Sequence, residues 1–251
     1  MDPINHLVII SLPKSATVFI QRSVEATLHA KHCLLSKPGA GQQMDAGLLH
    51  DFLAEPIATG GYHAPPSSHN LQILSENGLS RIALVVRDPR DAVVSWWRHL
   101  ERSDIRADLF ARDGTLRGGQ RSLSYYAMQR EDRLAYVIEH MYPILQTWLA
   151  DWAAAMETRR DFHVHVLRYE DFVLDPAKRL QDLFGFFGHE VTPIVPEREG
   201  PPELVSGGVH THTHFRRGVV GSHKDEIPAH LMPLLEKLTV PAIFRTFDWQ
   251  L

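Results

Sequence analysis

The sequence predicts an α/β fold in which helices flank a central parallel sheet. Three short apolar runs have the pattern of buried strands, and each is followed by polar or proline-containing residues and then by a helical pattern. Because parallel strands need a crossover between them, this order favours a parallel sheet. A chain of 251 residues, 44% of them hydrophobic, fits one domain over residues 1–251. The three runs are Leu7–Ile10, Ile82–Val86 and Val164–Leu167.

Charge and composition argue against several kinds of partner. A formal net charge of -4 provides no basic field, so we expect no nucleic-acid partner. Cys33 is the only cysteine, which excludes an intrachain disulfide and fits a reducing compartment. The N-terminus lacks the basic start of a secretory signal, and no apolar stretch approaches the roughly 18 residues of a membrane span. We therefore expect a cytoplasmic protein that does not span a membrane.

Between the first two strands, the pattern predicts two helices separated by a long loop. The first helix is expected over about Thr17–Lys31 and the second over Ser67–Asn77. The stretch from Lys37 to Pro66 is rich in glycine and proline, which is typical of a loop.

The second half of the chain is mainly helical. A long helical pattern covers Ser122–Met156, and we expect Pro143 to break it because proline lacks a backbone N–H. Trp148 and Trp152 lie at i,i+4 spacing, which is most simply a stripe that faces the core. A further amphipathic helix is expected over Asp175–Phe187.

The segment Ser11–Thr17, directly after the first strand, has the pattern of an anion site. When a tight polar loop connects a strand to a helix, the loop N–H groups and the positive end of the helix point at the same spot, where an anion can bind. The segment is not a Walker A loop, because G-x-x-x-x-G-K-[ST] is absent and Lys14 comes early in the loop. ATP or GTP binding thus loses its main support. Taken alone, Lys14 would be interpreted as an ordinary solvated lysine.

This loop resembles the P-K-S-G-T-T-W loop of the PAPS-dependent sulfotransferases, which wraps the 5'-phosphosulfate of 3'-phosphoadenosine 5'-phosphosulfate (PAPS). The resemblance implies that backbone amides hold the 5'-phosphate, that Thr17 adds a hydroxyl and that Lys14 contacts the bridging oxygen. Ala16 replaces a glycine, Val18 removes a hydroxyl, and Phe19 keeps an aromatic ring where the family has tryptophan near the adenine. The implied donor-binding residues in this loop are Lys14, Ser15, Ala16, Thr17, Val18 and Phe19.

A second phosphate motif follows the next strand. The family's R-x-P-x-D-x-x-x-S pattern is present at every fixed position from Arg87 to Ser95. Pro89 suits the first turn of a helix, and Asp91 suits its positive end. Arg87 and Ser95 can then clamp the 3'-phosphate through a guanidinium fork and a hydroxyl. The alternative is an Arg87 that pairs with a core carboxylate and a Ser95 that caps a helix or faces solvent.

Two later segments resemble the same family. Residues 167–171 resemble L-x-Y-E-D-L, which makes Tyr169 the candidate for contact with the adenine. Residues 215–224 resemble R-K-G-x-x-G-D-W-K, with Ser222 and His223 in place of aspartate and tryptophan. The residues that this segment would close over the 3'-phosphate are Arg216, Arg217 and Gly218. The resemblance implies a P-loop-NTPase-like sulfotransferase architecture.

Sulfuryl transfer needs the donor and acceptor held in line and the growing charge on the leaving phosphate neutralised. It also needs a base that takes a proton from the acceptor. Lys14 suits the leaving oxygen, because a compact ammonium can follow a moving charge. His63 lies in Gly-Tyr-His-Ala-Pro, which resembles the H-x-P element that bears the family's catalytic base, and histidine titrates near neutrality. His69 is the nearest rival, and a histidine without a catalytic role is the alternative for His63. The predicted catalytic residues are Lys14, His63 and Ser95.

The predicted enzyme transfers a sulfuryl group from PAPS to a hydroxyl or amine of a small-molecule acceptor without a metal. The nucleotide product of this reaction is 3'-phosphoadenosine 5'-phosphate (PAP). No pattern in the sequence identifies the acceptor. A nucleotide kinase-like phosphotransferase is one alternative, although it would need a standard P-loop. A metal-binding module is the other, built on the alternating His210, His212 and His214. The family's C-terminal dimer motif is matched only at Thr239 and Val240, so the sequence does not predict the oligomeric state.

Overall fold

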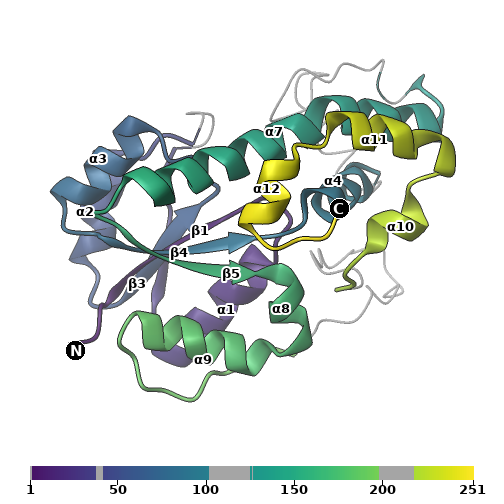
Figure 1. Cartoon of the computed structure of the whole chain (residues 1–251). Coiled ribbons are helices and arrows are strands. Elements are labelled where there is room, and N and C mark those ends of the chain that lie inside the picture. The colour runs from purple at the N-terminus through teal and green to yellow at the C-terminus, as the bar shows by residue number, and fades with distance from the viewer. Residues whose placement is uncertain (1, 38–41, 102–124, 126, 198–217) are drawn as a thin grey trace. The chain divides into compact units, whose positions relative to one another are not determined.

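The chain forms two compact units, and Figure 1 labels their helices and strands. The first comprises residues 1–87 and 148–198, and the second comprises residues 88–147 and 199–251. The structure, a computed structural model, describes residues 2–37, 42–101, 125, 127–197 and 218–251. A single sulfotransferase domain over residues 1–251 stays a prediction.

The first unit is built on a five-stranded sheet in the order β2-β3-β1-β4-β5, and every neighbouring pair is parallel. The apolar residues of β1 and β4 are buried on both faces, as expected for a parallel sheet covered on both sides. The predicted α/β fold with a central parallel sheet is confirmed. The strands are β1 (His6–Ser11), β2 (Lys31–Cys33), β3 (Ala58–Tyr62), β4 (Arg81–Val86) and β5 (His163–Arg168).

Several helices of the first unit begin at side-chain caps. The Ser67 hydroxyl accepts from Asn70 N at the start of α3, and the Asp175 carboxylate accepts from Lys178 N at the start of α9. The helices are α1 (Thr17–Leu28), α2 (Ala46–Ala54), α3 (Ser68–Glu76), α8 (Tyr169–Leu174) and α9 (Pro176–Phe186), together with the last turns of α7 (Arg130–Thr158).

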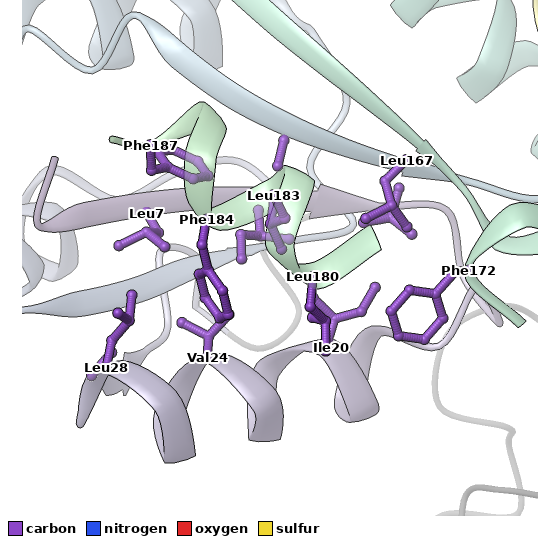
Figure 2. Close-up of a cluster of buried hydrophobic side chains, with 14 residues drawn as sticks. Leu7, Ile20, Val24, Leu28, Leu167, Phe172, Leu180, Leu183, Phe184 and Phe187 are labelled. Carbon is purple, nitrogen blue, oxygen red and sulfur yellow. The ribbon is translucent and has the colours of Figure 1, made fainter. Parts of the chain in front are cut away.

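One face of the sheet carries a hydrophobic core formed with α1 and α9, as Figure 2 shows. Leu7 of β1 belongs to this core, and Val24 and Ile20 of α1 lie beside Phe184 and Leu180 of α9. These side chains are essentially inaccessible to solvent. The core therefore fixes α1, and with α1 the loop that connects it to β1.

The prediction that residues 37–66 form a loop was wrong, because α2 and β3 lie there. The predicted first helix also ends earlier, and β2 begins at Lys31. Strand β3 has no apolar run because its neighbours leave no room for side chains at Gly60 and Gly61. A Cβ on Gly60 would lie 2.8 Å from the Cys33 carbonyl oxygen, and one on Gly61 would lie 2.7 Å from the Ile9 carbonyl oxygen. The glycines of β3, which made this stretch resemble a loop, are required by the close packing of neighbouring strands.

The second unit contains most of α7, and the predicted break at Pro143 was wrong. Helix α7 runs through the proline without interruption. Side chains on both sides of Pro143 hold this part of the helix. The Tyr142 hydroxyl lies 2.8 Å from Thr239 Oγ1, and Gln146 donates to the Leu238 carbonyl at 2.8 Å. The other described helices of this unit are α4 (Pro89–Leu100), α10 (Ser222–Glu226), η1 (Ala229–Leu231), α11 (Met232–Leu238) and α12 (Pro241–Thr246).

Trp148 and Trp152 are buried, which confirms that they face the core. In the described part of the chain, no helix combines the length and apolar character needed to cross a membrane. A cytoplasmic location stays a prediction.

Replacing Phe184 by alanine should lower the free energy of unfolding by about 3–5 kcal/mol, because the lost ring leaves a cavity between α1 and the sheet. Urea unfolding monitored by circular dichroism measures the change. Leu174→Ala is the control, since that side chain is 82% exposed and its loss should change stability by less than about 0.5 kcal/mol. Equal losses in the two variants would contradict this assignment of the core.

Candidate functional site

The predicted site residues of the first unit follow the carboxyl ends of four adjacent strands. The register pairs Ile10 with Tyr62, Ser11 with Val85, and Val86 with Arg168. The segments after β3, β1, β4 and β5 therefore start beside one another along one edge of the sheet. Ligands of open α/β sheets bind at this edge. The residues delivered there are His63, the loop 12–16, Arg87 and Tyr169.

The loop between β1 and α1 turns through two left-handed residues. Lys14 has φ 71° and Ala16, the N-cap of α1, has φ 67°. Ser15 Oγ donates to the Leu12 carbonyl at 2.5 Å, which closes the turn. Because Ala16 has no side-chain acceptor, no side chain at the cap position accepts from the first-turn N–H groups of α1. Such a helix start can receive an anion.

Ser11, at the end of β1, links this loop to His63. Ser11 Oγ lies 2.7 Å from Thr17 Oγ1, and His63 Nδ1 lies 2.6 Å from the Ser11 carbonyl oxygen. A carbonyl can only accept, so Nδ1 carries the proton and Nε2 carries the lone pair. Ser11 begins the predicted anion-site segment, but no individual role was predicted for it. Its only signal in the sequence is a polar residue that ends an apolar run.

The charge state of His63 follows from its surroundings. Burial lowers the pKa of His63 below its usual 6.5, the Ser11 carbonyl acts in the opposite sense, and the positive charge of Lys14 lowers it further. His63 is thus the neutral imidazole at pH 7, the form required of a general base. Two of the predicted catalytic residues, Lys14 and His63, therefore lie close enough for the charge of one to act on the pKa of the other.

Arg87 lies at the start of the segment after β4, and its guanidinium is buried. Its Nη1 donates to the Lys14 carbonyl at 2.7 Å, and the guanidinium carbon lies 4.1 Å from the centroid of the Tyr169 ring. The buried Nε has no hydrogen-bond partner among the residues that the structure describes. A buried cationic N–H is costly to leave unpaired, so an anion at this position would complete the coordination of Arg87.

The remaining predicted residues of the first loop differ in exposure. Thr17 is buried, and Val18 is half-buried. The Phe19 ring packs edge-on against Phe172 of α8, with centroids 5.5 Å apart. Contact of Phe19 or Tyr169 with an adenine stays a prediction.

Ser95 and Gly218 belong to the second unit. Ser95 is half-buried in α4, and Gly218 has φ 61°. The predicted Arg216 and Arg217 lie outside the described residues. The combined clamp of Arg87 and Ser95 stays a prediction.

Asp91 organises the segment after Gly218. Its carboxylate accepts from the Gly221 N–H at 2.6 Å and the His223 N–H at 2.9 Å, and it lies 2.6 Å from His223 Nδ1. Asp91 and His223 are both almost fully buried. The residues that depart from the family pattern, Ser222 and His223, thus contact the aspartate of the second phosphate motif.

Two predictions concern metals and the nearest rival base. No group of three or more metal-ligating side chains occurs within the described ranges, and His210, His212 and His214 fall outside them. His69 lies in α3, as predicted, and its Nε2 is 2.9 Å from the Met44 carbonyl oxygen.

The family model for the sulfotransferase domain matches residues 5–240. The chain belongs to the sulfotransferase family. This confirms the resemblance found in the sequence, and with it the prediction of a PAPS-dependent sulfotransferase. A search of curated proteins by sequence finds no match.

Solved sulfotransferase structures share the fold. A mouse sulfotransferase complexed with PAP superposes with a TM-score of 0.62 at 16% identity, over 100% of this chain and 91% of the other. A sulfotransferase from Alicyclobacillus acidocaldarius gives 0.53 at 15% identity, over 100% and 98%. Retinol dehydratase in complex with retinol and PAP gives 0.54 at 15% identity, over 100% and 84%.

Replacing Ala16 by glycine should raise the free energy of unfolding by about 0.5–1 kcal/mol, because glycine adopts the left-handed conformation without a Cβ penalty. Chemical denaturation measures the difference. The matched control is Ala154→Gly in the exposed interior of α7, which should lower stability by about 1 kcal/mol. A loss of stability in both variants would contradict the strain assigned to Ala16.

Proposed function

We propose that this sulfotransferase binds PAPS at the edge formed by β3, β1, β4 and β5, and transfers its sulfuryl group to a hydroxyl or amine of a small molecule. The observation that carries the proposal is the buried Arg87 guanidinium, whose Nε lacks a partner among the described residues and whose Nη1 donates to the Lys14 carbonyl in the loop between β1 and α1. The PAP-bound relatives support the same donor.

The two phosphates of the donor would use different residues. The loop amides of Ser15 and Ala16 and the Thr17 hydroxyl would hold the 5'-phosphate at the start of α1. Arg87 would hold the 3'-phosphate, and the resemblance in sequence adds Ser95, Arg216, Arg217 and Gly218 to this role. PAPS supplies an activated sulfuryl group on a bridging oxygen that leaves with the nucleotide.

His63 would act as the general base. Its Nε2 would take the proton as the acceptor oxygen or nitrogen forms its bond to sulfur and the bond from sulfur to the bridging oxygen breaks. Lys14 would stabilise the charge that grows on this oxygen. The Ser11 carbonyl holds Nδ1 and so directs the opposite ring nitrogen to this role.

The acceptor is proposed only as a small molecule that carries a hydroxyl or amine. Retinol and androsterone, both alcohols, are bound in structures of retinol dehydratase. We propose the cytoplasm as its location, where a reduced Cys33 would be stable.

Replacing Arg87 by alanine should weaken PAP binding about 100-fold, because charge-assisted hydrogen bonds to the 3'-phosphate are lost. Isothermal titration calorimetry with PAP, and with ATP as a nucleotide that lacks the 3'-phosphate, measures the effect. Wild type should prefer PAP strongly.

The matched control is Arg81→Ala, at the opposite end of the same strand, where the guanidinium donates to the Phe186 carbonyl. It should change PAP affinity less than about twofold. If wild type binds PAP no more tightly than ATP, the proposed donor site is wrong.

Catalysis should require neutral His63. Because the pKa of His63 in the free protein is lowered, the acid limb of the kcat/KM profile should have its midpoint below pH 6.5. Steady-state rates from pH 5 to 9 measure the profile.

His63→Ala should reduce kcat by about 100-fold or more and abolish the acid limb. His69→Ala, which removes a histidine from α3, should leave kcat within about twofold. Retention of the acid limb in the His63 variant would assign the base to another residue.

A further inference from the structure

The backbone between β3 and α3 carries His63 and has no strand partner of its own. Three successive carbonyls in this irregular segment are nevertheless paired with buried side-chain N–H groups. Trp148 Nε1 donates to the His63 carbonyl at 3.0 Å, and Trp152 Nε1 donates to the Ala64 carbonyl at 3.2 Å. Asn70 Nδ2 donates to the Pro65 carbonyl at 2.9 Å. We call Trp148, Trp152 and Asn70 the carbonyl clamp.

Each member of the carbonyl clamp is itself held in place. The two indoles lie one turn apart on α7, with centroids 6.1 Å apart, and both are buried. Asn70 of α3 is 1% exposed, and its Oδ1 accepts from Met44 N at 2.8 Å, which sets the orientation of the amide. Packing alone would be satisfied by phenylalanine or leucine, whereas the carbonyls need the N–H groups.

We infer that Trp148 is a positioning residue for His63, and that Trp152 and Asn70 complete a clamp that fixes the three residues around it. This inference rests on the proposed role of His63 as general base. Trp148 holds the backbone of His63, while the Ser11 carbonyl holds its ring at Nδ1. Because the backbone carbonyl and the ring Nδ1 of His63 are both held by hydrogen bonds, its Nε2 points in a single direction. A proton-transfer group needs such placement, because a small displacement reduces the rate strongly.

Trp148→Phe tests the inference, because it keeps an aromatic ring and removes the N–H donor, while its loss of ring volume is matched by the Trp97→Phe control below. We expect kcat to fall about tenfold, with the KM for PAPS and the Kd for PAP changed less than about twofold. The acid limb of the pH profile should move up towards 6.5, since a loosened His63 is less buried and burial is the main cause of its lowered pKa. The charged group known to act on His63 is Lys14, and it is unchanged in the variant.

Trp97→Phe is the matched control for loss of a buried indole. Trp97 is 3% exposed, and its Nε1 has no hydrogen-bond partner in the described part of the chain. This control should leave kcat and the acid limb as in wild type. Trp152→Phe provides a second variant should Trp148→Phe fail to fold, and its effect on kcat should be about threefold because it acts one carbonyl away from His63.

A second readout does not depend on turnover. Nitrogen-15 NMR of the histidine rings, with the His63 signals assigned from the His63→Ala spectrum, reports both the tautomer and the titration midpoint. In wild type the proton should reside on Nδ1, and Trp148→Phe should raise the midpoint or mix the tautomers. If this change occurs in a protein without sulfuryl transfer, the positioning inference stands and the proposed function fails.

Three results would overturn the inference. One is a Trp148→Phe protein whose kcat and His63 titration both match wild type. Another is a loss of kcat matched by an equal loss of PAP affinity, which would indicate a general structural role. The third is an equal loss of kcat in Trp97→Phe.

Discussion

The pairing of β3 with β1 is the constraint on which the proposed site depends. Parallel strands must approach closely enough for ladder hydrogen bonds, and here Gly60 and Gly61 allow β3 to fit between β1 and β2. A side chain at Gly61 would collide with the backbone at Ile9. The register sets the end of β3 beside the end of β1, which places His63 against the Ser11 carbonyl. The tautomer of His63 is therefore decided by strand packing.

Arg87 connects the two phosphate motifs through the backbone of the first. Its hydrogen bond to the Lys14 carbonyl holds a loop residue that has a left-handed conformation. The same guanidinium stacks on Tyr169, the residue that follows β5. One buried cation thus contacts residues from two neighbouring strand ends, and a further anion at its Nε would stabilise all of these contacts together.

Buried polar groups in each unit pair with backbone groups that no strand ladder or helix satisfies. In the first unit, indole and amide donors satisfy the carbonyls of residues 63–65. In the second unit, the Asp91 carboxylate accepts from the N–H groups of Gly221 and His223 at the start of α10. Such groups are costly to bury alone and stabilising when fully paired, so each specifies one arrangement of the backbone around it.

The sequence alone determined the fold class and the family, and it predicted the two phosphate motifs. Apolar runs at β1 and β4 predicted buried parallel strands, and Lys14 and Arg87 were identifiable because a short local pattern follows each run. Such features depend on neighbours along the chain, which a sequence displays directly.

Only the tertiary structure decided how β3 and the residues around His63 are held. Strand β3 lacks an apolar run because Gly60 and Gly61 lie too close to the backbones of the adjacent strands to carry a Cβ. Pro143 stays within α7 while side chains near it are bound by the segment around Thr239. Trp148 and Trp152 were predicted as core residues, and their hydrogen bonds to the carbonyls of residues 63 and 64 could not be foreseen. All of these features depend on partners far away in the sequence, and the hydrogen bonds of Trp148, Trp152 and Tyr142 reach partners more than 80 residues away, so no local pattern encodes them.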